Sequence, residues 1–535
     1  MSDPLAALGL ISSGSRPALP GGVPQTVAEV IDRIVAADPE REALVGRHGR
    51  LSFAALDRAA NRAANALAAL GVVPGERVAA CLPNDVDLPI VFLATQRLGA
   101  LWVGVNRLLA PPEKAYLLRD SGARVYLTLR VRPDELSAVT ADLPELAHVI
   151  GVAPGEADCP WASRCAAASD ARPAVAIDSF APAAIAYTSG TTGFPKGAVH
   201  SQHNLLLPGT IQHLTRRVPP GTRQGAVLPL TILNLVILEV LAPWIDGRAV
   251  VAIDRTDPLG LAEWIRSERV GAFSGVPTIY HDLLTHPEVK SADLASLVMP
   301  SVGGSDVPPE LVRLFLARFG CGVGIGYGMT EAPTGVTWSD GGVPSQPGLC
   351  GKPSPQVEIE IVDESGRVLP AGEIGEISVR PARSGPYAGV YTPMLGYWRK
   401  PAATAKALSG ERYLTGDLGF LAEDGNLYIR GRRNELILRG GANVYPAEVE
   451  RALQQHEAIE FAAVFGIPDE RLGERVVAVV QPRPGHAAPA EESLQAFCHE
   501  RIARYKVPDR IASLATLPRN AMGKVVKREL QGLFE

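Results

Sequence analysis

The stretch Tyr187-Thr-Ser-Gly-Thr-Thr-Gly-Phe-Pro-Lys-Gly197 directly follows an apolar, strand-like run at residues 183–186. Its glycines allow the backbone to approach a ligand closely and to adopt positive φ. Backbone N–H groups and hydroxyls can then surround phosphate oxygens, and Lys196 adds a positive charge. The segment is not a Walker A loop, in which Ser or Thr follows the lysine. It therefore predicts a different phosphate-binding loop at the end of a strand.

On both sides of this loop, short apolar runs alternate with helical stretches, a pattern that indicates an α/β fold with largely parallel sheets. From about residue 345 the strands lie among Gly-rich turns, as in a smaller β-rich subdomain. A final unit begins near residue 432, and its first helix is predicted to open at Pro446. Before residue 280 the expected strands are 77–81, 101–105, 124–127, 148–152, 185–188, 249–253 and 272–276.

The composition excludes several classes of protein. Of the 535 residues, 46% are hydrophobic and 20% are charged, with a formal net charge of −5, so extensive disorder is excluded. Without an excess of basic residues, the chain is not expected to bind nucleic acid. Its six cysteines form no C-x-x-C pair. Such cysteines are typical of free thiols in a reducing cytoplasm, which is the predicted location.

Two segments bear on membranes and secretion. The N-terminal residues lack the basic and apolar regions of a secretory signal, so we expect none. Residues 226–245 are apolar, but Glu239 near their middle would be unfavourable in hydrocarbon. We therefore expect a buried or pocket-lining helix there and no transmembrane segment.

The loop at 187–197 resembles the signature of the AMP-forming adenylating superfamily, which includes acyl-CoA synthetases, adenylation domains and luciferases. Other segments resemble motifs of that family in the same order, although Gly104 stands where proline is common. These segments are 98–106, 303–305, 326–331, 413–417, 431–435, 440–446 and 518–524. The resemblance covers nearly the whole chain, from about residue 26 to 530. It implies ATP and coenzyme A as substrates and Mg²⁺ as the metal ion.

The resemblance also assigns residues to the nucleotide. Thr188 and Glu331 would hold Mg²⁺, for which a carboxylate is a hard oxygen ligand. Adenine would border Gly304, Ser305 and Tyr327, and no frame of residues 322–328 gives the dinucleotide pattern G-x-G-x-x-G. The ribose hydroxyls would be held by Asp417 and Arg432. The phosphates would be held by Thr188, Ser189, Gly190, Thr191, Thr192, Gly193, Lys196 and Thr330.

In the family, the lysine that matches Lys524 bridges the acyl carboxylate and the nucleotide during adenylation. Its charge would offset the repulsion between the carboxylate and the α-phosphate, so Lys524 is the expected catalytic residue. The family's C-terminal unit rotates after pyrophosphate leaves, and Gly440 and Gly441 would then line the passage for the thiol. The hinge commonly carries Asp or Lys where this chain has Asn434, which leaves the balance of that rotation open.

The acyl pocket departs from many CoA ligases, which have an aromatic residue and histidine after Pro-Leu. Here Thr231 and Ile232 follow Pro229-Leu230, so an apolar wall and an apolar acid (aromatic, alicyclic or medium-chain) are expected. No aspartate occurs between residues 228 and 238, which argues against activation of an α-amino acid. The expected pocket residues are Ile232, Asn234, Gly303 and Gly328.

The predicted protein is an AMP-forming acid–CoA ligase of fatty or aromatic acid metabolism that acts on a small-molecule carboxylic acid. The acid and MgATP would give acyl-adenylate and pyrophosphate, and the thiol of coenzyme A would then displace AMP. Alternatives left open are an acyl carrier protein as acceptor, an enzyme that performs mainly adenylation, and a non-catalytic nucleotide-binding protein. A homodimer also stays open.

The predicted fold class is α/β, with a large N-terminal domain of layered α/β subdomains plus a β-rich subdomain. A small mobile α+β C-terminal domain completes it. The expected boundaries are an extended lead-in at 1–25, an N-terminal ATP- and acid-binding domain at 26–431 (β-rich at 345–431), a hinge at 432–436, and a C-terminal domain with Lys524 at 437–535.

Overall fold

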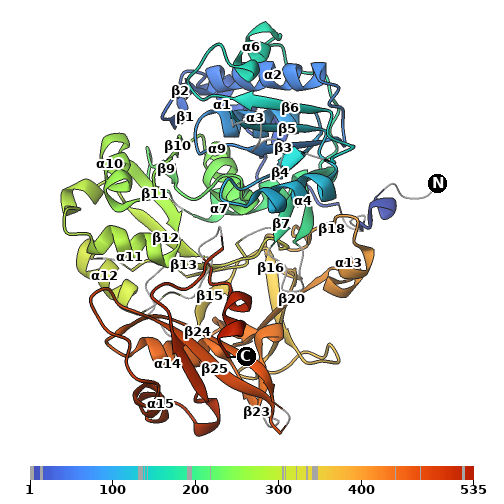
Figure 1. Cartoon of the computed structure of the whole chain (residues 1–535). Helices are drawn as coiled ribbons and strands as arrows, with labels where there is room; N and C mark the ends of the chain where they lie inside the picture. Colours follow the sequence, from blue (N-terminus) through green and yellow to red (C-terminus); the bar gives the residue numbers. More distant parts are fainter. Residues whose placement is uncertain are drawn as a thin grey trace. The chain divides into compact units, whose positions relative to one another are not determined.

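The computed structural model divides the chain into two compact units (Figure 1). The first contains Met1–Glu360, Ser378–Leu414 and Gly425–Leu427, and the second contains Ile361–Ile377, Thr415–Asp424 and Tyr428–Glu535. The structure describes residues 5–11, 16–130, 137, 139–140, 142–188, 195–216, 218–303, 307, 309–320, 322–332, 335–339, 348–439, 442–469, 471–520 and 524–534, with the backbone alone at 309 and 434. The domain boundaries expected from the sequence stay a prediction.

One sheet of the first unit has seven strands in the order β18-β8-β7-β4-β3-β5-β6. Strand β3 pairs in parallel with β4 and β5, β5 with β6, and β4 with β7, whereas β8 is antiparallel to both β7 and β18. Helices α2 (Phe53–Ala69), α3 (Asp87–Arg97), α4 (Pro111–Ser121) and α6 (Pro160–Ala167) accompany these strands. The strand bounds are β3 (Arg77–Cys81), β4 (Leu101–Gly104), β5 (Val125–Leu129), β6 (His148–Val152), β7 (Pro182–Thr188), β8 (Lys196–Ser201) and β18 (Gly396–Tyr397).

A second series of strands in the first unit has the order β15-β14-β13-β12-β11-β9-β10-β1-β2. The pairs from β13 to β1 are parallel. Helices α10 (Pro258–Glu268), α11 (Pro277–Thr285) and α12 (Pro309–Phe319) belong to this part. The strand bounds are β1 (Glu42–Gly46), β2 (Gly49–Ser52), β9 (Arg223–Ala226), β10 (Val250–Ala252), β11 (Val270–Gly275), β12 (Met299–Gly303), β13 (Gly324–Tyr327), β14 (Thr337–Ser339) and β15 (Leu349–Pro353).

An aromatic core packs these strands against their helices. Phe273 of β11, Tyr280 of α11 and Phe315 of α12 are fully buried. The Phe273 and Tyr280 rings stack with their centroids 4.5 Å apart, and the Phe315 ring meets Tyr280 edge-on at 4.9 Å. Because side chains alternate along a strand, the neighbours of Phe273 point to the opposite face of the sheet. Ser274, the next residue of β11, therefore lies on the opposite face.

The apolar stretch at 226–245 differs from the single helix predicted for it. Ala226 ends β9, and helix begins only at α8 (Leu233–Val236), followed by a π-helical turn, η3 (Ile237–Leu241), and α9 (Ala242–Ile245). Pro229 lies between strand and helix, where a residue without a backbone N–H interrupts regular pairing. The described residues contain no helix that is both long enough and apolar enough to cross a bilayer.

The second unit contains a five-stranded sheet in the order β23-β22-β25-β24, with β26 beside β25. Helix α14 (Pro446–Gln454) opens at the proline, as predicted, and α15 (Glu491–His499) follows later in the unit. Val449, Leu453, Val464 and Leu494 are buried in the core between them. The strand bounds are β22 (Ile437–Arg439), β23 (Ala442–Val444), β24 (Ile459–Asp469), β25 (Gly473–Pro482) and β26 (Arg510–Ser513).

Four further strands pair in the order β16-β17-β20-β21, and their residues are divided between the two units. Their bounds are β16 (Val357–Val362), β17 (Gly375–Pro381), β20 (Arg412–Leu421) and β21 (Leu427–Arg432). They occupy the region where short strands among glycine turns were expected. The predicted α/β class, with parallel sheets and a β-rich region, is confirmed.

Candidate active site

The predicted phosphate loop connects two paired strands of the first unit. Strand β7 ends at Thr188, β8 begins at Lys196, and these two residues face each other across the antiparallel pair. The Thr188 hydroxyl donates to the Lys196 carbonyl at 3.4 Å, and the Tyr116 hydroxyl donates to the Pro195 carbonyl at 3.0 Å. Both ends of the loop are therefore fixed. The predicted Ser189, Gly190, Thr191, Thr192 and Gly193 lie outside the described residues.

Tyr397 connects two predicted site residues that are far apart in the sequence. The Lys196 ammonium lies 5.2 Å from the centroid of the Tyr397 ring, and the phenol donates to Glu331 Oε1 at 2.9 Å. Burial, followed by the neighbouring Glu331 charge, raises the pKa of Tyr397, so the phenol stays protonated and remains a donor. No motif pointed to Tyr397. Its position depends on the pairing of β18 with β8, which places it opposite Ala198.

Thr330 is held beside the same strand by a histidine that the motifs also missed. His200 Nε2 lies 2.6 Å from the Thr330 carbonyl, which only accepts, so Nε2 carries the proton. Burial lowers the pKa of His200 to about 4, which keeps the imidazole neutral near pH 7. The structure thus brings Thr188, Lys196, Thr330 and Glu331 together around β8.

The donor groups fit Mg²⁺ better than a metal held by protein ligands alone. Within the described ranges, no group of three or more His, Cys, Asp or Glu side chains could hold a metal ion. Mg²⁺ commonly binds through one or two carboxylates together with nucleotide phosphates and water. Glu331, oriented by Tyr397, and the Thr188 hydroxyl supply hard oxygen atoms of this kind.

Three of the predicted adenine and acyl residues, Gly303, Tyr327 and Gly328, lie at the ends of β12 and β13. Gly303 pairs in register with Gly326, and among the described residues the nearest atom to a Cβ added to Gly303 would be the Gly326 carbonyl oxygen, at 3.6 Å. Tyr327 is mostly buried and Gly328 is exposed. Gly304 and Ser305 lie outside the part of the chain that is described. Within the described part of the chain, the sheet therefore leaves space in front of Gly303.

The backbone of the segment at 231–234 packs closely against a glycine, Gly104. A Cβ added to Gly104, at the end of β4, would lie 1.8 Å from the Thr231 carbonyl oxygen. The glycine that departs from the family pattern therefore admits the backbone of Thr231 at this point. Ile232 follows directly and caps α8, which contains Asn234, and both residues are partly exposed.

In the second unit, Asp417 and Arg432 come together. Arg432 Nε lies 3.3 Å from Asp417 Oδ1. The turn before Asp417 is shaped by Gly416, whose φ of +74° favours glycine. The Thr415 hydroxyl accepts a hydrogen bond from the Asp417 amide at 3.0 Å and donates to the Ile377 carbonyl at 2.8 Å. Asp417 is thus a positioned carboxylate.

Lys524 belongs to the same cluster. The Asn520 side chain accepts from the Lys524 amide at 3.0 Å, and the Asn520 amide donates to the Lys524 carbonyl at 2.8 Å, so Lys524 is fixed against Asn520. Burial lowers the pKa of Lys524 and Arg432 lowers it further, whereas Asp417 and Glu435 raise it. Part of the residue nevertheless remains exposed. Three motifs predicted separately therefore form one group of charges.

Glu376 links this group to the predicted hinge segment. Its carboxylate accepts from the Gly416 amide at 3.0 Å and from Arg433 Nη1 at 2.9 Å. A single glutamate in a plain strand carries no sequence signal, so the motifs missed it. The side chain of Asn434, and Gly440 and Gly441 altogether, lie outside what the structure describes, so their expected roles stay predictions.

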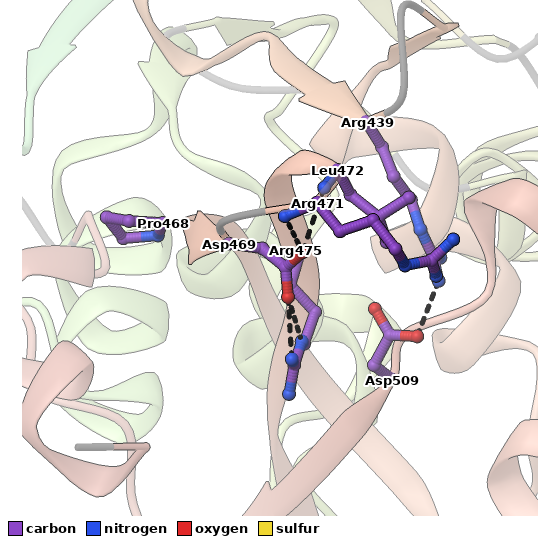
Figure 2. Close-up of a pocket in the computed structure, with 7 residues that line it drawn as sticks. All are labelled: Arg439, Pro468, Asp469, Arg471, Leu472, Arg475 and Asp509. Atoms are coloured by element: carbon purple, nitrogen blue, oxygen red, sulfur yellow. Dashed lines mark hydrogen bonds and ion pairs between the residues drawn. The ribbon is translucent and has the colours of Figure 1, made fainter.

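A pocket of about 630 Å³ in the second unit is lined by three arginines and two aspartates (Figure 2). Asp509 pairs with Arg439, and Asp469 pairs with Arg475. Arg439 also donates to the carbonyls of Tyr505 and Val507 at 3.0 Å. Two of the three guanidinium groups thus serve the fold of this unit. The pocket is lined by Arg439, Pro468, Asp469, Arg471, Leu472, Arg475 and Asp509.

The chain is similar to known proteins over most of its length. Residues 31–398 match the AMP-binding enzyme family and residues 448–524 match the AMP-binding enzyme C-terminal domain. A feruloyl-CoA synthase of Amycolatopsis sp is 35% identical over 494 residues, which cover 91% of this chain and 95% of that protein. A long-chain-fatty-acid–CoA ligase of Mycobacterium tuberculosis is 30% identical over 485 residues, covering 90% and 93%.

Solved structures are similar over nearly the full length. ATP-bound MatB from Rhodopseudomonas palustris has a TM-score of 0.85 at 29% identity, covering 95% of this chain and 99% of that chain. The anthranilate CoA ligase AuaEII in complex with anthranoyl-AMP also has a TM-score of 0.85, at 27% identity, covering 95% and 97%. The chain is a member of the AMP-binding enzyme family, within the AMP-forming adenylating superfamily that its motifs predicted.

Proposed function

We infer that the chain is an AMP-forming acid–CoA ligase. The observation that carries this function is the two charge clusters, each assembled from separate motifs. Lys196, Tyr397 and Glu331 form one cluster in the first unit. Asp417, Arg432 and Lys524 form the other in the second unit. Relatives over almost the whole length are named as acid–CoA ligases, which supports the same activity.

In the first half-reaction, a carboxylate oxygen of the acid attacks the α-phosphorus of ATP, and the bond to pyrophosphate breaks. We assign Lys524 to the incoming carboxylate, because its charge offsets the repulsion between two anions. We assign Asp417 and Arg432 to the ribose, the residues at 188–193 with Lys196 and Thr330 to the phosphates, and Gly304, Ser305 and Tyr327 to adenine. Ile232, Asn234, Gly303 and Gly328 are assigned to the acid.

Glu331 and Thr188 would hold Mg²⁺. When bound, its positive charge would offset the negative charge of the phosphate oxygens. In the second half-reaction, the thiol sulfur of coenzyme A attacks the acyl carbon, the thiol proton is lost, and AMP leaves. A cytoplasmic location fits the described cysteines, Cys81, Cys159, Cys165, Cys350 and Cys498, which are free thiols. A homodimer and the hinge role of residues 432–436 stay predictions.

The test is mass spectrometry of reactions with MgATP and a panel of carboxylic acids, with and without coenzyme A. We expect acyl-CoA only when coenzyme A is present. A preference for the phosphopantetheine of an acyl carrier protein over free coenzyme A would instead favour the alternative acceptor.

The residue assignment is tested with Lys524→Ala and with Lys406→Ala, an exposed lysine of α13 (Pro401–Ala407), as its matched control. We expect Lys524→Ala to lower the rate of acyl-adenylate formation by about 100-fold or more, because it removes a charge that stabilises the transition state. The control should keep the wild-type rate. Adenylation by Lys524→Ala at the rate of Lys406→Ala would refute the assignment.

A further inference from the structure

A buried carboxylate lies next to the expected acid pocket. Glu239, on the π-helical turn η3, is 1% exposed, and its Oε2 accepts a hydrogen bond from Gln224 of β9. Among the described residues, Oε1 has no hydrogen-bond partner at normal geometry. Burying such a group is unfavourable unless it is satisfied. π-Helical turns also occur frequently at functional sites.

Two serines lie between this carboxylate and the partly exposed face of the sheet. Ser274 of β11 and Ser301 of β12 are direct neighbours in register, with their Oγ atoms 2.9 Å apart. Both are partly exposed, whereas the adjacent Phe273 and Val302, which point to the other face, are buried. The hydroxyls therefore lie on the face that continues to Gly303, one of the residues expected to contact the acid.

An aromatic ring lies on the same face beside the serines. Ser301 pairs with Gly324 and Gly303 pairs with Gly326. A Cβ added to Gly324 would lie 2.6 Å from the Trp338 ring, so the indole covers these glycines. The Arg216 guanidinium stacks on the indole, with its central carbon 3.7 Å from the ring centroid. The floor of the site thus combines a flat aromatic wall with two hydroxyls.

Ser274 lies beside Glu239 and favours its charged form, against the burial that raises the pKa of Glu239 to about 7. Either of the two serine hydroxyls can donate to the other, and the Ser301 hydroxyl can also donate to the Phe273 carbonyl, 3.5 Å away. A hydroxyl oxygen has two acceptor lone pairs, so in either arrangement Ser301 can accept a hydrogen bond from a donor on a ligand.

We propose that Ser301, supported by Ser274 and Glu239, recognises a hydroxyl group on the ring of an aromatic carboxylic acid substrate. The aromatic ring is assigned to the wall formed by Trp338. The proposal rests on the proposed function, since the ligand is the acid that is adenylated. It also refines the expectation of an apolar pocket. Of residues 231 and 232, only Thr231 has a polar side chain, whereas β11 and β12 each supply a serine.

The test compares kcat/KM at pH 8 for cinnamate, its 3- and 4-hydroxy derivatives and the matching methyl ethers, measured as acyl-CoA formed. For wild type we expect the better hydroxylated acid to exceed both its deoxy analogue and its methyl ether by about 10- to 100-fold. In Ser301→Ala and Glu239→Gln this ratio should fall to near one. Ser267→Ala and Glu263→Gln, at exposed positions of α10, are the matched controls and should keep the wild-type ratio.

A ratio near one in wild type would overturn the proposal, as would an unchanged ratio in Ser301→Ala. If Glu239→Gln does not fold, as judged by circular dichroism, Ser301→Ala decides alone. A ratio is used because general damage to the fold would lower the rates for all the acids together. Turnover without discrimination refutes this inference only. Failure of every acid, fatty acids included, to give acyl-adenylate or acyl-CoA would refute the proposed function, and the inference with it.

Discussion

The phenol of Tyr397 donates a hydrogen bond to Glu331, the expected metal ligand, and its ring contacts Lys196 of the phosphate loop. The substitution Tyr397→Phe removes the hydroxyl and keeps the ring. The residue is 6% exposed and donates to Glu331 Oε1 at 2.9 Å. A hydrogen bond to a charged group contributes about 1.5–3 kcal/mol, and each 1.4 kcal/mol corresponds to a factor of about ten. We therefore expect kcat/KM for MgATP to fall by about 10- to 100-fold.

The matched control is Tyr391→Phe. The Tyr391 side chain is 3% exposed, and its hydroxyl has no hydrogen-bond partner within the described part of the chain. Its removal leaves no partner unsatisfied, so stability should be unchanged or rise by about 1 kcal/mol and activity should stay at the wild-type level. The same chemical change at two buried tyrosines thus separates the contact with Glu331 from burial itself.

The assay is acid-dependent exchange between pyrophosphate and ATP, measured across a Mg²⁺ titration. Because Tyr397 orients a proposed Mg²⁺ ligand, the Mg²⁺ concentration at half-maximal activity should rise in Tyr397→Phe and not in Tyr391→Phe. The Lys196 contact with the ring is kept by phenylalanine, so it contributes little to the difference. If the two variants agree within twofold in kcat/KM and in Mg²⁺ dependence, Tyr397 does not position Glu331 for the nucleotide.

Two further predictions concern the carboxylates of Glu376 and Glu239. Glu376→Gln should raise KM for ATP by about 2- to 5-fold, because it weakens the ion pair with Arg433 beside the turn at Gly416. Glu364 is a 92% exposed partner of the same arginine, so the control Glu364→Gln should leave KM unchanged. Equal KM values for the two variants would contradict this role of Glu376. The pKa of Glu239 is raised from 4.5 to about 7 in the folded state, so its contribution to stability is full below pH 4.5 and is lost as the pH rises through 7. Between pH 5 and pH 8 the free energy of unfolding of wild type should fall by about 2–3 kcal/mol relative to that of Glu239→Gln. The measurement is the difference between the thermal midpoints of the two proteins, which should shift by a few degrees over this range. A constant difference would show that the carboxylate does not titrate between pH 5 and pH 8.

Local patterns predicted the strands well where the chain alternates short apolar runs with turns. The ranges 77–81 and 148–152 match β3 and β6 to the residue. The prediction of a single helix at 226–245 was wrong, because a continuous apolar run does not distinguish strand from helix over short segments. Its π-helical turn, which places Glu239, has no sequence signature comparable to a capping residue or a glycine turn.

The motifs located residues whose chemistry depends on their immediate neighbours, such as Thr188 and Lys196 at the two ends of one loop. They missed Tyr397, His200 and Glu376, because each becomes part of the site only through tertiary pairing. Tyr397 reaches Lys196 across the β18–β8 pair, and Glu376 reaches Gly416 from a strand about 40 residues earlier in the chain. Those contacts are properties of the sheet rather than of any segment.

The same argument explains why the expected acid pocket was apolar. That expectation rested on Thr231 and Ile232, which follow Pro229-Leu230 where many CoA ligases have an aromatic residue and histidine. The hydroxyls come from β11 and β12, and the carboxylate behind them comes from η3, so no single segment contains the polar chain. In a parallel sheet, side chains at matching register lie next to each other whatever their separation in sequence. Ser274 and Ser301 are such a pair, and we infer that they, more than residues 231–232, determine which acid this enzyme selects.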